Sequence, residues 1–206
     1  MQRRPGTMNG IMSRAGFTLF ATALGDCAVA WNGVGLIGVW LPEATPARLR
    51  SRIERRFANL RETAAPAAVA EAVDAITRLL DGQRVELGDV RIDDSQLGDF
   101  DRRVYAGART IPAGRVVTYA ALAERIGGAV SPRAVGQSLG RNPFPIVVPC
   151  HRIVAAHGEL GGFSAPGGAA TKRRLLAIED ARLEGPAQLF DPVGPFATGT
   201  RSEPAA

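Results

Sequence analysis

The stretch TYAALAERIGGAVSPRAVGQSLG, residues 118–140, decides the fold of the second half of the chain. Its first residue, Thr118, is a good N-cap for a helix over residues 119–126, which two consecutive glycines end. Ser131 and Pro132 then start a second helix that runs to about the end of the stretch, because serine is a favoured N-cap and proline suits the first helical turn. Two short helices joined by a brief glycine-containing turn predict a helix-turn-helix.

The second of these helices is predicted to have a low surface, because four of its side chains are small: Ala134, Gly136, Ser138 and Gly140. Arg133 and Arg141 flank them. Small residues beside arginine suit a phosphate backbone or a narrow groove, and tight packing against another element of the protein is the alternative. The residues alone leave both interpretations open.

The sequence RNPFPIVVPCHRI, residues 141–153, follows directly and contains a cysteine next to a histidine. The apolar run 146–148 resembles a buried strand, so we expect Cys150 to emerge at a sheet edge. His151 and Arg152 are potential cations and would favour the thiolate over the thiol. On an extended chain His151 points away from Cys150, so a Cys-His pair needs a turn or a bridging water. A reactive thiol and a structural thiol are equal alternatives at this point.

Cysteine arithmetic excludes two classes of site. Two cysteines cannot form a disulfide-rich scaffold or a four-cysteine zinc site. Cys150, His151 and His157 lie close in the sequence, but no second cysteine stands at a metal-ligand spacing, so no metal site is predicted. A disulfide with Cys27 would be unusual in a cytoplasmic protein.

The first half of the chain predicts a small β-sheet covered by helices. An Asn-Gly pair between two apolar runs is a strong hairpin signal, because both residues tolerate positive φ. The expected strands cover residues 17–23, 27–31 and 35–41, and amphipathic helices are expected over 47–63, 66–80 and 97–108. The predicted fold is an N-terminal α/β domain over 14–94, followed by a mainly α C-terminal domain over 95–184 with a winged-helix-like helix-turn-helix.

The positive charge is concentrated in the second half and is carried almost wholly by arginine. Lys172 is the only lysine among 25 basic residues. Residues 1–100 hold 12 basic and 12 acidic side chains, whereas residues 101–206 hold 13 and 8, which accounts for the net charge of +5. An electrostatic partner is therefore expected to meet the second half. The arginines of the helix over 47–63 are interpreted as a solvated face rather than a binding patch.

The two ends of the chain carry no fold signal. Residues 1–13 are polar and contain glycine and three methionines, which predicts a disordered lead, and residues 185–206 hold four prolines and read as an irregular tail. The apolar stretch 17–31 loosely imitates a signal peptide, but Asp26 interrupts it and the run is too short for a membrane span. A cytoplasmic protein is expected.

Two segments carry a family resemblance: IPAGRVVTY, residues 111–119, and PCHRIV, residues 149–154. Together with Gly162-Phe163-Ser164 and the stretch LLAIE at 175–179, they resemble the O6-alkylguanine-DNA alkyltransferases, the methylated-DNA–protein-cysteine methyltransferases. The resemblance is strong over residues 97–181 and weaker over 17–93. The combination of Arg-Asn-Pro with Pro-Cys-His-Arg behind such a helix pair is highly specific.

The resemblance implies a reaction that each molecule performs once. Cys150 would take the alkyl group from O6-alkylguanine, or from O4-alkylthymine, in double-stranded DNA and would not be regenerated. His151 would deprotonate the thiol through a bridging water, and Glu179 would orient the imidazole and balance its charge. No cofactor and no metal are implied, and the protein is expected to act as a monomer.

The resemblance also implies how the base is reached, because an enzyme acting on a base must flip it out of the duplex. Tyr119 would lie at the pocket and donate to guanine N3. Arg133 would fill the vacated stack through the minor groove, and Ala134 and Gly136 would permit the close approach. Asn142 would brace the turn between the recognition helix and the thiol.

Three further residues are implied around the base. The backbone carbonyls of Cys150 and Ile153 and the backbone N–H of Ser164 would read the guanine edge. Phe163 stands where some relatives have tyrosine and keeps an apolar wall. Ala165-Pro166 lengthens the following loop relative to shorter members, which leaves the range of accepted alkyl groups open.

Two other functions compete with repair. A non-repairing damage recogniser would bind the lesion without using its thiol, and an unrelated thiol hydrolase would turn over. The presence of Cys150 differs from the alkyltransferase-like sensors that lack it, and the N-terminal half has no Cys-rich zinc module, so the transcription-regulating type is not supported.

Overall fold

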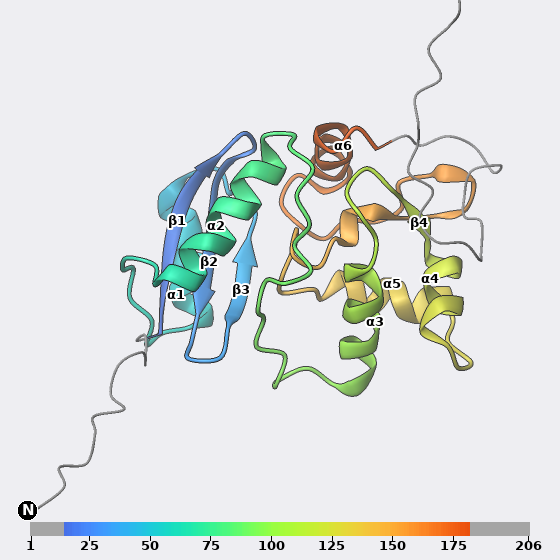
Figure 1. Ribbon diagram of the computed structural model, residues 1–206, viewed down its shortest axis with the longest axis horizontal. Helices are drawn as coiled ribbons and strands as arrows, with labels where there is room; N and C mark the ends of the chain where they lie inside the picture. Colours follow the sequence, from blue (N-terminus) through green and yellow to red (C-terminus); the bar gives the residue numbers. More distant parts are fainter. Residues whose placement is uncertain (1–14, 182–206) are drawn as a thin grey trace, which may run out of the picture.

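The computed structural model describes residues 15–181. The predicted lead over 1–13 and the predicted tail over 185–206 lie outside these residues. In Figure 1 the sheet and its two helices occupy one side of the molecule. The other side holds α3 (Asp99–Arg109), α4 (Tyr119–Ile126) and α5 (Pro132–Gly140), and α6 (Gly168–Ile178) lies at the top. No helix within residues 15–181 could cross a membrane, the longest having 14 residues.

The three predicted strands are confirmed. They form one antiparallel sheet in the order β1-β2-β3, with bounds Gly16–Thr22, Gly25–Trp31 and Leu36–Trp40. The side chain of Asn32 stabilises the second turn, since its Oδ1 accepts from the backbone N–H groups of Val34 at 2.8 Å and Gly35 at 3.2 Å. This local bond explains why the Asn-Gly signal located the turn correctly.

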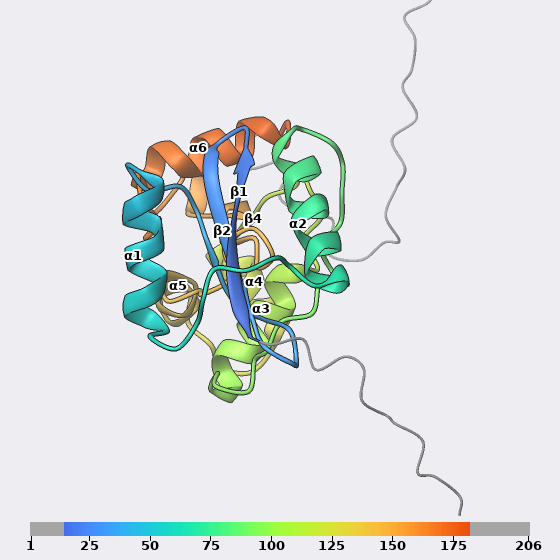
Figure 2. The same ribbon diagram turned by 90° about the vertical axis from the view of Figure 1, so that its left-hand side faces the viewer.

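The sheet is buried on both faces, between α1 (Pro46–Arg56) and α2 (Ala67–Leu80), as Figure 2 shows. The residues of β2 alternate between two hydrophobic clusters, as the pleat of a strand requires. Ala28 and Ala30 pack with Ile53 of α1, whereas Val29 packs in the larger cluster with Ile76 of α2. The larger cluster also contains side chains from the second half of the chain, so the two halves pack together.

The helix predicted over 47–63 is shorter than expected and ends at Arg56. The chain beyond it pairs with the edge of β1 instead. The N–H of Phe17 donates to the carbonyl of Arg61 at 3.1 Å, and the N–H of Thr63 donates to the carbonyl of Phe17 at 3.0 Å. Two hydrogen bonds to a strand edge therefore replace the last turns of the expected helix.

The second half contains the predicted helix-turn-helix between short connecting elements. Their bounds are α3 Asp99–Arg109, β4 Val117–Thr118, α4 Tyr119–Ile126, α5 Pro132–Gly140, η1 Cys150–Arg152, β5 Ile153–Val154, η2 Ala156–Gly158 and α6 Gly168–Ile178. Both predicted N-caps are confirmed: Thr118 Oγ1 accepts from Ala121 N at 3.0 Å and Ser131 Oγ accepts from Ala134 N at 3.2 Å. β4 and β5 form a parallel pair, with Val117 opposite Ile153 and Thr118 opposite Val154.

The prediction of a strand over residues 146–148 is wrong. The segment is a compact turn in which Ile146 has φ of 77° and the N–H of Val148 donates to the carbonyl of Phe144 at 2.7 Å. Three prolines in residues 143–149 lack the N–H that a strand ladder needs, so the apolar run folds on itself. A hydrogen bond from Val39 N to Pro143 O, at 2.9 Å, ties this turn to the sheet.

Ile53→Ala tests how firmly α1 is held. Ile53 is fully buried in the smaller cluster, so its truncation should lower the free energy of unfolding by about 2–5 kcal/mol through lost burial and the remaining cavity. Urea unfolding followed by circular dichroism measures the change. Ser51→Ala, at an exposed position of the same helix, should stay close to wild type, and an equal loss in both variants would contradict this account.

Candidate active site

The thiol of Cys150 lies on a tight turn rather than at a sheet edge. Cys150 is the first residue of η1 and is only 9% exposed. Its N–H donates to the carbonyl of Val148 at 2.8 Å, so the backbone enters η1 directly from the compact turn. Cys150 and His151 are thus consecutive residues of a 3₁₀ turn rather than of an extended strand.

Asn142 braces the segment between α5 and the thiol. Its Nδ2 donates to the carbonyl of Val148 at 2.9 Å, and its Oδ1 accepts from the N–H of Phe144 at 2.9 Å. A further hydrogen bond from this side chain lowers the pKa of Cys150. Asn142 therefore holds the backbone on both sides of the turn.

The thiol is less acidic than the sequence suggested. Burial raises the pKa of Cys150 above its ordinary value, and the hydrogen bond of Asn142 and the charge of Lys172 offset this only in part. The expected help from the side-chain charges of His151 and Arg152 is missing, and His151 lowers the pKa of Cys150 only through its backbone N–H. Burial lowers the pKa of His151, so the imidazole is neutral at pH 7, and Arg152 forms its ion pair elsewhere. Cys150 is therefore a thiol near neutral pH and needs a base.

Glu179, at the end of α6, meets both neighbours of the cysteine. Its Oε1 lies 2.9 Å from His151 Nε2 and accepts from Arg152 Nη2 at 2.8 Å, and its Oε2 accepts from Arg152 Nε at 2.9 Å. All three side chains are buried. Burial alone would raise the pKa of Glu179, but the hydrogen bonds and charges of His151 and Arg152 together lower it to about 2. The carboxylate is thus ionised and shared between two partners.

This pairing determines the tautomer of His151. An ionised carboxylate can only accept, so Nε2 must carry the hydrogen that it donates to Glu179. Nδ1 of the neutral ring then holds a free lone pair. Within residues 15–181, Nδ1 is buried and has no hydrogen-bond partner. The ring can therefore take up a proton at Nδ1 while Glu179 stabilises the resulting charge.

Two cations near the thiol are buried, and the sequence indicated a different role for Arg152 and none for Lys172. Arg152 was expected to act on the thiolate, but its Nη1 donates to the carbonyl of Ile111 at 2.5 Å and its remaining groups bind Glu179. Lys172 is fully buried, its Nζ donates to the carbonyl of Ile153 at 2.5 Å, and burial lowers its pKa to about 8. The one signal for Lys172 was that the chain uses a single lysine among its arginines.

A cavity of about 650 Å³ leads from the surface to Cys150 along α5. It is lined by six of the predicted site residues, namely Tyr119, Arg133, Gly136, Cys150, Phe163 and Ser164, together with Pro132, Gln137, Leu139, Gly140 and Gly162. The structure thus brings the predicted substrate residues of α4, α5 and the 162–164 loop around one opening. Ala134 is half-buried on α5, and Arg133 is exposed at the start of the helix.

The remaining predicted residues contribute through backbone and anchoring contacts. Ser164 Oγ donates to the carbonyl of Gly140 at 2.8 Å and so ties the loop to the end of α5. The carbonyl of Ile153 already accepts from Lys172, but a carbonyl oxygen has a second lone pair for another donor. Within residues 15–181, no group of three or more His, Cys, Asp and Glu side chains could hold a metal ion.

Comparison with known proteins finds a matching family and several relatives. Residues 99–181 match the family described as "6-O-methylguanine DNA methyltransferase, DNA binding domain". The methylated-DNA–protein-cysteine methyltransferase of Methanothermobacter thermautotrophicus is 34% identical over 160 residues, which cover 78% of this chain and 82% of that protein. The protein of the same name from Mycobacterium bovis is 40% identical over 61% of this chain and 74% of its own length.

Solved structures agree with these relatives. The crystal structure of Mycobacterium tuberculosis O6-methylguanine methyltransferase superposes with a TM-score of 0.64 at 33% identity, covering 85% of this chain and 97% of that one. A structure of the M. tuberculosis protein in complex with DNA also has a TM-score of 0.64, at 30% identity over 80% and 92% of the two chains.

A sequence relative from Thermus thermophilus has a different name, "DNA base-flipping protein", and is 35% identical over 73% of this chain and 99% of its own length.

Glu179→Gln tests the ionised carboxylate through the pH dependence of stability. The folded pKa lies below the unfolded value of 4.5, so the stabilisation is present above pH 4.5 and is lost as pH falls toward about 2. A shift of this size corresponds to about 3 kcal/mol at neutral pH. The free energies of unfolding of wild type and variant, measured in urea from pH 2 to 6, should therefore converge toward low pH.

Asp180→Asn provides the matched control, because it removes an adjacent but exposed carboxylate. This variant should keep the wild-type slope. Parallel curves for wild type and Glu179→Gln would show that Glu179 is not held ionised by its partners.

Proposed function

Since the chain belongs to the methylated-DNA–protein-cysteine methyltransferase family, we propose that it repairs DNA by direct reversal, with Cys150 as the alkyl acceptor. The observation that carries this proposal is a buried thiol at the end of a cavity beside a helix-turn-helix, next to a histidine whose Nδ1 is free to accept a proton. The substrate is double-stranded DNA containing O6-alkylguanine, with O4-alkylthymine as a second substrate. The protein acts as a monomer in the cytoplasm.

The reaction is a single displacement at the alkyl carbon. The thiol proton passes through a bridging water to Nδ1 of His151, whose positive charge Glu179 balances. The thiolate sulfur then forms a bond to the alkyl carbon, and the bond from that carbon to O6 breaks with its electron pair going to the guanine. Tyr119 donates a hydrogen bond to N3, where the guanine gains negative charge. The product is a thioether that no group in the site can cleave, so each molecule reacts once.

The base reaches the thiol only after it leaves the duplex, which costs a few kcal/mol. Arg133 is exposed at the start of α5 and offsets this cost by filling the vacated stack. A Cβ at Gly136 would meet only the ring of Tyr119, at an ordinary distance of 3.6 Å, so the fold itself does not require glycine there. Close approach of DNA, also across Ala134, is the reason we propose for these small residues. In this proposal α4 and α5 dock on the DNA as the helix pair of a winged-helix-like domain does, which brings α5 close to the duplex.

Backbone groups around the cavity read the flipped guanine. The carbonyls of Cys150 and Ile153 accept from the exocyclic amine, and the backbone N–H of Ser164 donates to O6. Phe163 lines the cavity and supplies an apolar wall for the ring. Asn142 keeps these groups in register with α5 through the turn. In this proposal the domain over 95–184 binds DNA and accepts the alkyl group, while the domain over 14–94 supports it.

A non-repairing recogniser is the second candidate, because one relative carries the name "DNA base-flipping protein". Such a protein would use the cavity but not the thiol. Binding of alkylated DNA that survives Cys150→Ala, together with no loss of the lesion over time, would favour this function.

Incubation with duplex DNA containing O6-methylguanine tests the repair function. Under reducing conditions the peptide with Cys150 should gain about 14 Da, the net mass of one CH₂ group, with at most one event per molecule. Mass spectrometry of the digested protein measures the gain. Cys27 is an internal control, because burial raises its pKa to about 11 and it should stay unmodified. An unchanged Cys150 peptide would exclude alkyl transfer.

His151→Ala tests the proposed base through the pH profile of the transfer rate. The rate should fall most near neutral pH, where the thiol cannot ionise unaided, and should recover in part at alkaline pH. Because burial raises the pKa of Cys150, this recovery should begin above the ordinary thiol range. Single-turnover rates from pH 6 to 10 give the profile, and a loss of the same size at every pH would indicate a structural role.

A further inference from the structure

A second cavity reaches Cys150 from the side of the sheet. It has a volume of about 470 Å³ and lies between α1, the end of β3 and the loop around Ser164. Cys150, Phe163, Ser164 and two residues at the end of α5 line both cavities. The thiol and the loop therefore separate two openings, and the proposed mechanism uses only the one beside Tyr119.

The second cavity is strongly cationic. The residues that line it include four arginines and no acidic residue: Arg52, Arg55 and Arg56 of α1, and Arg141 at the end of α5. Over its 11 residues, α1 contains five arginines and one glutamate. The net charge of residues 1–100 is zero and does not indicate this cluster of arginines, because most of the balancing acidic residues lie outside α1 in the sequence.

Two of the four guanidinium groups lack an acidic partner. Arg52 pairs with Glu43 at 2.5 Å, and Arg141 pairs with Asp101 at 3.1 Å. Within residues 15–181, no carboxylate lies within ion-pair distance of Arg55 or Arg56, and both side chains are exposed. The guanidinium of Arg56 stacks over the ring of Phe57, 5.4 Å from its centroid, which restrains it without neutralising its charge.

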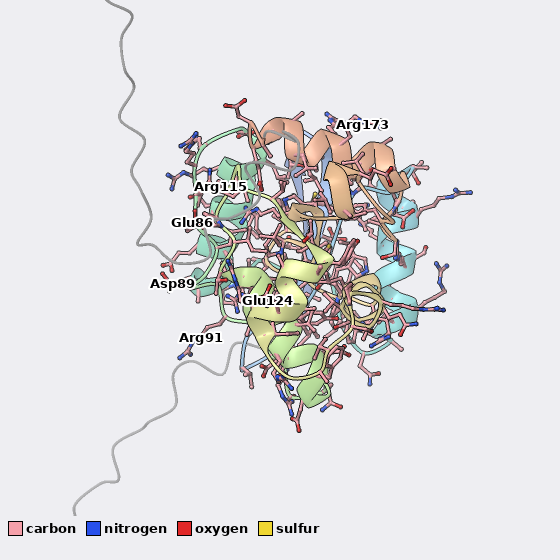
Figure 3. All side chains as sticks on the ribbon, turned by 90° about the vertical axis from the view of Figure 1, so that its right-hand side faces the viewer. Glu86, Asp89, Arg91, Arg115, Glu124 and Arg173 are labelled. Atoms are coloured by element: carbon pink, nitrogen blue, oxygen red, sulfur yellow. The ribbon has the colours of Figure 1, made fainter. Side chains whose placement is uncertain are left out.

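These arginines continue the surface of the helix-turn-helix. Leu49 and Ile53 are buried and hold α1 against the sheet, whereas the arginines that line the cavity are exposed. Figures 2 and 3 both show α1 beside α5 along one edge of the molecule. Leu139 and Gly140 of α5 line the cationic cavity as well as the cavity beside Tyr119. A duplex lying on α5 would therefore have α1 at its side.

We infer that Arg55 and Arg56 bind phosphates of the DNA backbone beside the alkylated nucleotide, so that the N-terminal half contributes to the DNA interface. This inference rests on the proposed function, which makes DNA the partner. The planar guanidinium matches phosphate geometry and stays charged, and a cavity with four arginines and no carboxylate favours an anion over any neutral or cationic ligand. The contact would anchor the strand near Cys150 while the base is outside the stack.

The salt dependence of DNA binding tests this contact. Each phosphate neutralised on B-DNA contributes about 0.9 to the slope of log K against log salt concentration. For lesion-free duplex, the double variant Arg55→Ala with Arg56→Ala should make this slope less steep by about two units. At about 0.1 M salt it should also bind about five- to tenfold more weakly per arginine removed. Fluorescence anisotropy titrations at salt concentrations from about 0.05 to about 0.3 M measure both the slope and the binding constant.

Arg91→Ala is the matched control, because Arg91 is exposed and Figure 3 shows it on the side of the molecule away from α1. The salt slope of Arg91→Ala should equal that of wild type. The double variant Arg55→Lys with Arg56→Lys should keep most of the slope, because lysine keeps the positive charge. An unchanged slope in the alanine variant, or an equal loss in Arg91→Ala, would overturn the inference. Thermal unfolding shows whether each variant is folded.

The outcome is separable from that of the proposed function. At saturating alkylated DNA the alanine variant should still gain the mass of the alkyl group on Cys150, because the thiol and its base are intact. Failure of this gain in wild type would contradict the repair function, whereas the slope on lesion-free DNA would still report the phosphate contacts. Full alkylation with an unchanged slope would contradict only the role of Arg55 and Arg56.

Discussion

The buried pair of Glu179 with Arg152 is the interaction on which the candidate site depends. It joins α6 to η1 across 27 residues of sequence and keeps the carboxylate ionised. An ionised Glu179 can only accept, and this forces the hydrogen of His151 onto Nε2 and leaves Nδ1 free. Removing either charge would leave the other buried and unpaired, which costs several kcal/mol. The same ion pair therefore stabilises the fold and sets the tautomer of His151.

The turn between α5 and η1 fixes the position of α5 relative to the thiol. Asn142 closes it with two side-chain hydrogen bonds, and its prolines prevent the apolar run from pairing as a strand. The bond from Val39 N to Pro143 O attaches the same turn to the sheet. The N-terminal half thus supports the site directly, and in the inferred DNA interface it also supplies Arg55 and Arg56.

Features of the fold that depend on local hydrogen bonds were predictable. The caps at Thr118 and Ser131 and the turn at Asn32 each join atoms within three residues, so the sequence pattern located them. The end of α1 and the path of 146–148 were not predictable in this way. The first depends on the distant edge of β1, and the second on how one turn packs between α5 and the sheet.

The sequence by itself determined which chemistry was available: one cysteine beside a histidine, arginine as the cation and small residues on a capped helix. It did not determine the state of the thiol, since burial raises the pKa of Cys150 and His151 is neutral. The ion pair of Arg152, the burial of Lys172 and the gathering of arginines from both halves around one cavity were decided by the tertiary structure alone. The physical reason is that ionisation and charge pairing depend on neighbours in space, which lie far apart in the chain.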